Sequence, residues 1–277
     1  MAASEQAVDQ HYGSADISAR IVEALTEAGK NIDQIQRSDL SPFDEFHGGG
    51  IASTRALASF AELHNGMQVL DIGCGIGGPA RTLAAEFDCH VTGVDLTLEF
   101  VRAAEMLTAR LGMDAVCTFK QGSATAVPLA DSGFDCVWSQ NMMMNVANKA
   151  AFFDEVVRLL KPNGIFAFEA VLEGNGEAIH LPTFWASKPE INFLVARATL
   201  ESLLESAGLE PVALEETTTQ VIEHGRKRKA AFATHDPANL TIHVIVPDEV
   251  DLKMDNALRN NEQGRTITIK GVYRKRP

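Results

Sequence analysis

Between residues 66 and 172, short apolar runs alternate with segments in which apolar residues recur at every third or fourth position. Short apolar runs are typical of buried strands, and the second spacing is typical of amphipathic helices. The expected strands are Met67–Ile72, Cys89–Val94, Val116–Gln121, Phe134–Ser139 and Gly164–Leu172. The expected helices between them are Pro79–Phe87, Thr97–Leu111 and Ala150–Leu160. This alternation predicts an α/β fold, a mostly parallel sheet with helices on both faces.

The segments on either side have a different pattern. Residues 15–30 and Ala52–Leu63 show helical spacing, so residues 1–65 are expected to form a helical N-terminal cap on a main domain of residues 66–277. Further helices are expected over Thr199–Ala207, with Thr199 as the cap, and over 248–262, and further strands over Leu209–Glu216 and Thr266–Arg274. The segments 173–197 and 217–262 are expected to be lid insertions. Within them, the apolar residues of 217–247 fit neither the helical nor the strand spacing.

The composition narrows the class of protein. The chain has 277 residues, 45% of them hydrophobic, and a net charge of −13, which argues against non-specific binding to nucleic acid or to an anionic membrane. No apolar run approaches the length of a membrane span, and no secretory signal pattern is visible. The four cysteines form no Cys-x-x-Cys pair, so neither a metal site nor a disulfide framework is indicated. We expect a cytoplasmic protein that acts on a small molecule; a homodimer stays open.

A glycine-rich turn follows the first strand of the alternating region. Gly73, Gly75 and Gly78 satisfy the pattern Gly-x-Gly-x-x-Gly, and Asp95 ends the next expected strand, 20 positions after Gly75. Glycines let the backbone approach a ligand closely, and an acid at the second strand end can bond ribose hydroxyls. The pattern therefore fits a nicotinamide dinucleotide and a nucleoside such as S-adenosylmethionine equally well.

Asp71, two residues before the first glycine, separates these two cofactors. A dinucleotide places its pyrophosphate near this turn, where a carboxylate would repel it. S-adenosylmethionine has no phosphate, and its ammonium and sulfonium groups are both positive. A short-chain reductase would also need a Tyr-x-x-x-Lys pair, but Tyr12 and Tyr273 are followed four positions later by Asp16 and Pro277. Asp71 therefore favours S-adenosylmethionine.

Three further motifs accompany the glycine turn. They are Val91-Thr92-Gly93-Val94-Asp95, Phe134-Asp135-Cys136-Val137-Trp138-Ser139-Gln140 and Leu160-Lys161-Pro162-Asn163-Gly164. Together they resemble the class I S-adenosylmethionine-dependent methyltransferases, in the small-molecule branch that includes ubiquinone/menaquinone-biosynthesis-like and sarcosine/dimethylglycine methyltransferase-like proteins. The resemblance covers about residues 66–172. It implies a Rossmann-like sheet of seven strands whose last strand, here Thr266–Arg274, is antiparallel.

The resemblance also implies which residues contact the cofactor. These are Tyr12, Asp71, Gly73, Cys74, Gly75, Asp95, Leu96, Ser123, Ala124 and Gln140. Asp71 and the glycines would hold the methionine end, Asp95 the ribose, and Leu96 would pack on the adenine. Ser123 stands where the family has an acid that bonds the adenine amino group, and a hydroxyl accepts that bond more weakly than a carboxylate does. Tyr12 belongs to a segment that folds over the cofactor in relatives.

The same resemblance places the methyl-transfer centre beside Gln140 and Asn145, the latter where many relatives have a histidine. If the acceptor must lose a proton, Glu169 and His180 are the candidate bases. His47 is a further candidate for contact with the acceptor. The implied reaction is in-line transfer of a methyl group from S-adenosylmethionine to an N, O, S or C atom of a small molecule, which depends mainly on alignment.

Two other functions stay open at this point: a protein that binds the cofactor without methyl transfer, and an NAD-dependent oxidoreductase. The acceptor is not identified by the sequence. The lining of the pocket beside Gln140 and Asn145 would indicate its class. Acidic side chains would favour an amine, a flat aromatic slot a phenol or quinone, and arginine a carboxylate. Phe184 and Trp185 are candidates for stacking on an aromatic or cationic acceptor, although packing of the lid would also account for them.

Overall fold

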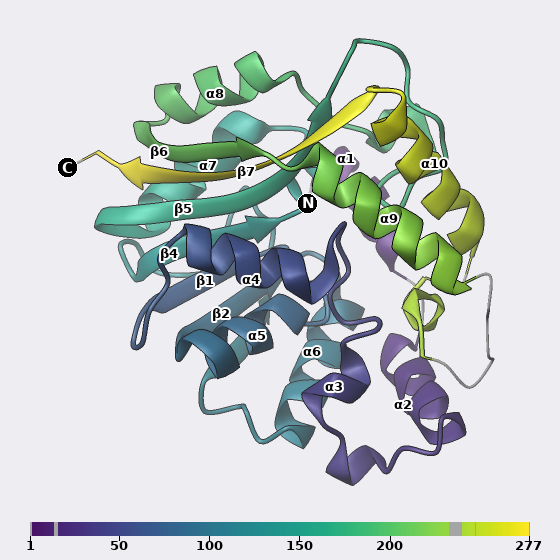
Figure 1. Ribbon diagram of the computed structural model, residues 1–277. Coiled ribbons are helices and arrows are strands. Elements are labelled where there is room, and N and C mark those ends of the chain that lie inside the picture. The colour runs from purple at the N-terminus through teal and green to yellow at the C-terminus, as the bar shows by residue number, and fades with distance from the viewer. Residues whose placement is uncertain (1, 14–15, 233–239, 247, 277) are drawn as a thin grey trace.

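The structure, a computed structural model, describes residues 2–13, 16–232, 240–246 and 248–276 (Figure 1). Its centre is a seven-stranded sheet in the order β3-β2-β1-β4-β5-β7-β6, in which β7 runs antiparallel to both β5 and β6. The strands are β1 (Gln68–Ile72), β2 (His90–Asp95), β3 (Cys117–Gln121), β4 (Phe134–Gln140), β5 (Leu160–Glu173), β6 (Leu209–Glu216) and β7 (Thr266–Lys275). The predicted mostly parallel sheet with an antiparallel last strand is confirmed.

Helices cover both faces of the sheet because successive strand residues point to opposite sides (Figure 1). Helices α4 (Gly50–Phe60), α5 (Gly78–Phe87) and α6 (Leu98–Arg110) pack on one face, in an apolar cluster that includes Val69 and Trp138. Helices α7 (Lys149–Leu159) and α8 (Arg197–Ser206) pack on the other face, in a cluster that includes Leu70 and Val137. Strands β1, β2, β4, β5 and β7 therefore contribute residues to two separate cores.

The remaining helices belong to the segments before and after the alternating region. They are α1 (Ala3–Tyr12), α2 (Ile17–Glu27), α3 (Arg37–Leu40), α9 (Thr218–Phe232) and α10 (Val250–Glu262), with short 3-10 turns η1 (Ile32–Gln34), η2 (Met143–Asn145), η3 (Pro189–Ile191) and η4 (Ile242–Val244). Helix α2 packs against α6 through Ile17, Ile21 and Leu25, which are fully buried. Helix α9 lies beside α10 (Figure 1). The division at residues 65 and 66 stays a prediction, but α4 contributes Leu57 to the core under the sheet.

The differences from the expected elements include α1, α9 and the start of α8. Helix α1 was not expected, because its ten residues include few apolar side chains. Part of the segment 217–247 forms α9, which is mostly polar and gains its order by packing on α10 and β7; residues 233–239 and 247 lie outside the described residues. The expectation that Thr199 caps α8 is wrong. The chain pairs with β5 through Ala196, and the helix begins immediately after it.

No helix within the described ranges is long and apolar enough to cross a membrane. Likewise, the described side chains include no group of three or more His, Cys, Asp or Glu that could hold a metal ion.

Two leucines give a matched test of the packing. Leu204 in α8 is fully buried in the core, whereas Leu252 in α10 is 47% exposed. We expect Leu204→Ala to lower the free energy of unfolding by about 2–5 kcal/mol, because it removes buried methyl groups and leaves a cavity. Leu252→Ala should change it by no more than about 0.5 kcal/mol. Urea unfolding of both variants measures the difference, and equal losses would contradict the assignment of the core.

Candidate functional site

A cavity of about 410 Å³ lies at the carboxyl ends of β1, β2 and β4. Between β1 and β4 the order of the strands reverses, which is where open α/β sheets bind ligands. The volume is within the range of small-molecule sites, roughly 300–1,000 Å³. All ten residues expected to contact the cofactor line this cavity: Tyr12, Asp71, Gly73, Cys74, Gly75, Asp95, Leu96, Ser123, Ala124 and Gln140.

The glycine turn forms the floor of the cavity, and Asp95 holds it in place. Gly73 has a φ of 81°, a conformation that favours glycine, and a Cβ atom there would come within 2.4 Å of Met142. The backbone N–H of Gly75 donates to Asp95 Oδ2 over 2.8 Å, and that of Thr97 donates to Asp95 Oδ1 over 2.9 Å. Burial is the main cause that raises the pKa of Asp95 to about 6. Asp95 therefore links β2 to the turn after β1.

Asp71, at the end of β1, is a buried carboxylate without a full set of partners. Its side chain is 1% exposed, and Oδ2 has no hydrogen-bond partner. Burial is the main cause that raises its pKa well above the ordinary value, and the negative charges of Asp95 and Glu45 add to the effect. Because an unpaired buried carboxylate is costly, this position is suited to a cationic ligand group.

Helix α1 closes one side of the cavity through two polar contacts. Tyr12 Oη donates to Asn145 Oδ1 over 3.0 Å, and Asn145 Nδ2 donates to the carbonyl of Trp185 over 2.8 Å. Asn145 therefore ties α1 to the segment after β5. At the other end of the helix, Glu5 lines the cavity and accepts hydrogen bonds from the hydroxyl groups of Ser123 and Thr125.

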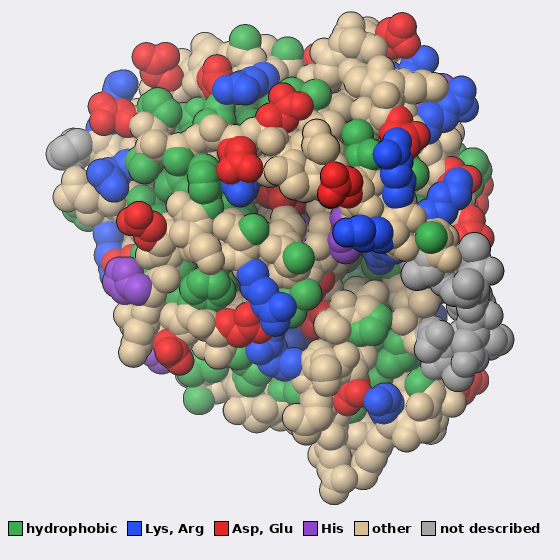
Figure 2. Space-filling model, in the orientation of Figure 1, with side chains coloured by type: hydrophobic (Ala, Val, Ile, Leu, Met, Phe, Trp, Pro, Cys, Tyr) green, Lys and Arg blue, Asp and Glu red, His purple; other side chains and the backbone are tan. Residues whose placement is uncertain are grey.

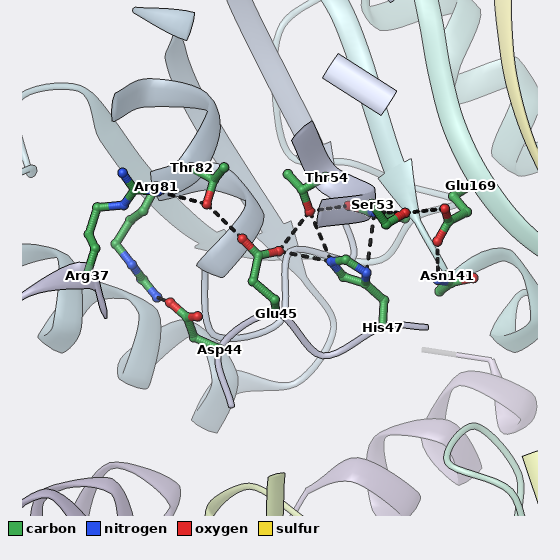
Figure 3. Close-up of polar contacts among 11 residues, drawn as sticks. Arg37, Asp44, Glu45, His47, Ser53, Thr54, Arg81, Thr82, Asn141 and Glu169 are labelled. Atoms are coloured by element: carbon green, nitrogen blue, oxygen red, sulfur yellow. Dashed lines mark hydrogen bonds and ion pairs between the residues drawn. The ribbon is translucent and has the colours of Figure 1, made fainter. Parts of the chain in front are cut away.

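A buried polar network lies beneath the cavity wall (Figure 3). Glu45 accepts hydrogen bonds from Thr82 over 2.7 Å and from Thr54 over 2.8 Å, and its Oε2 lies 2.9 Å from His47 Nε2. The Nδ1 atom of His47 lies 3.4 Å from Gln140 Nε2. A hydrogen on Nε2 satisfies Glu45 and leaves the Nδ1 lone pair facing Gln140. His47 and Gln140 both line the cavity, so this network fixes two side chains of its wall.

Glu169 on β5 belongs to the same network but does not line the cavity (Figure 3). It is 2% exposed, accepts a hydrogen bond from Ser53, and accepts one from Asn141 Nδ2 over 2.8 Å. Asn141 does line the cavity, and its Oδ1 is buried without a partner. Glu169 therefore holds Asn141 in position. Because its side chain does not line the cavity, we withdraw it as a candidate base.

The structure does not bring His180 to the cavity. Its backbone is clamped by Asn260, whose Oδ1 accepts from the His180 N–H over 2.7 Å and whose Nδ2 donates to the His180 carbonyl over 3.0 Å. The imidazole Nε2 lies 2.8 Å from Gln263 Oε1 in an exposed contact. We withdraw His180 as a candidate base because its contacts with Asn260 and Gln263 hold it away from the cavity lining. Phe184 and Trp185, from the same segment, do line the cavity.

Sequence reasoning missed Glu5 and the side chains of α9 and α10 that close the cavity. Those of α9 are Val221, His224, Gly225 and Arg228. The segment His224–Lys229 is strongly basic in an acidic chain, and the spacing of His224 and Arg228 places both on one helix face. This spacing of basic residues was the feature of the sequence that could have indicated a helix at the site. Figure 2 shows acidic and basic side chains intermingled on the face it presents.

Comparisons with known proteins agree with this geometry. Residues 70–168 match a family described as methyltransferase domain. The chain is 35% identical over 126 residues to botryococcene C-methyltransferase from Botryococcus braunii, covering 46% of this chain and 33% of that enzyme. It is 28% identical over 176 residues to a phosphoethanolamine N-methyltransferase from Triticum aestivum, covering 63% of this chain and 34% of that enzyme.

Solved structures show the same fold. Phosphoethanolamine N-methyltransferase 2 from Haemonchus contortus, in complex with phosphomonomethylethanolamine and S-adenosylhomocysteine, superposes with a TM-score of 0.76 at 19% identity. The match covers 100% of this chain and 61% of that one. The chain spans about a third of the length of the two curated relatives.

The buried charge of Asp71 can be tested by its effect on stability. A carboxyl group whose pKa is raised by folding stabilises the fold below its unfolded pKa, near 3.8, and this contribution is lost as the pH rises through the folded pKa. We expect the ligand-free protein to lose stability relative to the Asp71→Asn variant as the pH rises from roughly 4, by about 1.4 kcal/mol per unit between the two pKa values. Urea unfolding at several pH values measures this. The exposed Asp154→Asn variant is the control, and a difference between wild type and Asp71→Asn that is constant with pH would refute the explanation.

Proposed function

Because this chain belongs to the class I S-adenosylmethionine-dependent methyltransferases, we propose that it transfers a methyl group from S-adenosylmethionine to a nucleophilic atom of a small molecule. The observation that carries the proposal is the unpartnered carboxylate oxygen of Asp71 beside the glycine turn of the cavity. A pyrophosphate would be repelled there, so the site favours this cofactor over a nicotinamide dinucleotide.

The residues at this end of the cavity fit the cofactor group by group. Asp71 offers a carboxylate to the ammonium of the methionine part. Each oxygen of Asp95 accepts one backbone hydrogen bond and keeps a second lone pair for a ribose hydroxyl. Leu96 and Ala124 provide apolar surface for the adenine. When bound, S-adenosylmethionine supplies a methyl group on a positively charged sulfur, from which a nucleophile displaces it.

Alignment is the main contribution that we propose for the protein. Gln140 Nε2 donates to Ser53 Oγ over 3.3 Å, and Gln140 Oε1 lies 3.1 Å from the Thr54 hydroxyl, whose one hydrogen it shares with Glu45. Asn145 is held between Tyr12 and Trp185. Rigid side chains of this kind orient the acceptor for in-line attack, which supplies most of the rate enhancement that a transfer without acid–base chemistry needs.

A proton must leave when the acceptor atom carries one and the transfer would otherwise leave it charged. His47 is our candidate base for this step, in place of Glu169 and His180; its Nδ1, which lies 3.4 Å from Gln140 Nε2, is the nitrogen that would take the proton. Its Nε2 is paired with the buried carboxylate of Glu45, which orients the ring and would stabilise the imidazolium. A homodimer and a cytoplasmic location stay predictions.

Calorimetry with S-adenosylhomocysteine and with NAD, in parallel, tests the cofactor assignment. We expect the first to bind and the second not to bind. Asp71→Asn should weaken binding of S-adenosylhomocysteine by at least about 30-fold, since losing a buried charge pair costs about 2 kcal/mol or more. Asp154→Asn should bind as wild type does. Binding of NAD alone would refute the proposed function. Binding of S-adenosylhomocysteine without methyl transfer to any acceptor would favour the alternative of a protein that only binds the cofactor.

We also propose that Glu5 replaces the acid that the family has at the position of Ser123. Glu5 comes from α1 and accepts hydrogen bonds from both Ser123 and Thr125. Its carboxylate therefore lies beside the position that we propose for the adenine amino group. This contact would couple the closure of α1 to the presence of the cofactor.

An analogue of S-adenosylhomocysteine in which oxygen replaces the adenine amino group tests the role of Glu5. Wild type should bind S-adenosylhomocysteine about tenfold more tightly than the analogue, because a hydrogen bond to a charged group contributes about 1.5 kcal/mol. Glu5→Gln should reduce this preference to about threefold or less, and adding Ser123→Asp should restore it. Glu23→Gln, an exposed substitution on α2, is the control. An unchanged preference in Glu5→Gln would exclude the contact.

A further inference from the structure

The acidic and the basic side chains that line the cavity lie at different ends of it. The acidic side chains of its described lining are Glu5, Asp44, Asp71 and Asp95. They lie on α1, on the loop before α4 and at the ends of β1 and β2, and Asp44 is neutralised by a buried ion pair with Arg81. The positively charged or titratable nitrogen groups of the same lining are His47, His224 and Arg228. Among the described residues of the lining, the α9 side therefore holds the guanidinium of Arg228 and no carboxylate.

The basic end lies over the other half of the sheet. Helix α9, which carries His224 and Arg228, packs against α10 and β7, whereas the acidic end lies over β1 and β2 (Figure 1). The side chains of α9, α10 and β7 that line the cavity are Val221, His224, Gly225, Arg228, Met254, Ala257, Leu258, Asn261 and Thr268. None of these is acidic, although the whole chain has a net charge of −13.

Two buried polar atoms on the wall of this half of the cavity have no partner: Asn141 Oδ1 and Thr268 Oγ1. Glu169 accepts from the Nδ2 of Asn141, so the amide must present its oxygen on the opposite side (Figure 3). That oxygen can only accept a hydrogen bond, whereas the Thr268 hydroxyl can donate one. Unsatisfied buried groups of this kind are rare unless a ligand completes them.

We propose that the acceptor is an anionic small molecule, whose carboxylate or phosphate group is bound at the α9 end by Arg228, with His224 and Thr268 as hydrogen-bond donors. The inference rests on the proposed function, because it assigns the acidic end to the cofactor. Arg228 supplies the charge. Burial, and then the charges of Arg228 and His47, lower the pKa of His224, so its ring is neutral at pH 7 and donates through one N–H.

The same arrangement orients the acceptor. With its anionic group at α9, its nucleophilic end faces Gln140 and Asn141. Asn141 Oδ1 accepts a hydrogen bond from an N–H or O–H group, so the nucleophile is an amine or a hydroxyl group. A cationic donor at the acidic end and an anionic acceptor at the basic end also cannot exchange places without placing like charges together.

Titration of the protein saturated with S-adenosylhomocysteine tests this inference. Inorganic phosphate and acetate are the two anionic probes, trimethylammonium is the cationic probe, and ionic strength is held constant. Calorimetry and the fluorescence of Trp185, which lines the cavity, report binding. We expect saturable binding of at least one anion and none of trimethylammonium, and the stronger of the two anions identifies the group on the acceptor. Arg228→Gln should weaken anion binding at least tenfold, and Arg228→Lys should weaken it less.

Arg226→Gln is the matched control, because Arg226 is exposed on the same helix and pairs with Glu262 on the surface. It should bind the anions within twofold of wild type. Binding of S-adenosylhomocysteine, measured first in every variant, should stay within twofold and reports correct folding. Its failure in wild type refutes the proposed function, and this inference with it. Where it binds, the anionic acceptor is refuted if neither anion binds, if trimethylammonium binds instead, or if Arg228→Gln binds anions as tightly as wild type.

Discussion

The hydrogen bonds that Asp95 accepts from Gly75 and Thr97 connect three elements that the site depends on. They join the end of β2 to the turn after β1 and to the start of α6. A carboxylate in this place can only be retained if backbone donors compensate its burial, and the glycine turn provides one of them. The floor of the cavity is therefore set by main-chain geometry.

Polarity organises the rest of the cavity. Carboxylates at strand ends are costly to bury, and the structure places them where a cation is expected to bind. The basic groups come from α9, at the opposite end, which is contributed by a different segment of the chain. The network through Glu45, His47 and Gln140 contributes rigidity, because its hydrogen bonds fix the positions of His47 and Gln140 in the cavity wall. In the proposed arrangement, the pocket would hold a cationic donor and an anionic acceptor in a defined order.

The sequence predicted the parts of this arrangement that local patterns specify. The order of strands and helices between residues 66 and 172 follows from apolar periodicity, and the ten expected cofactor contacts all line the cavity, because each lies at or beside a strand end or in a recognisable motif. The contact between Glu5 and Ser123 joins residues 118 positions apart and has no periodic signal. His180 was expected in the site from its place in a lid segment, but two hydrogen bonds from Asn260 decide its position, and the partner of such a clamp is not visible in one sequence. Helix α9 is too polar for apolar spacing to reveal it.

Helix α1 also has a kinetic consequence. It forms one wall of the cavity, yet Val8 is the one buried residue among its ten. Its other contacts include the hydrogen bonds of Glu5, His11 and Tyr12 and the ring contacts of Tyr12 with Phe46 and Phe100. Detaching such a helix costs far less than unfolding the sheet, so it is the inexpensive route by which a nucleoside can enter or leave. We therefore expect exchange of spent cofactor to depend on how often this short helix detaches. Any sequence joined in front of α1, an affinity tag included, would then be attached to the helix on which that exchange depends.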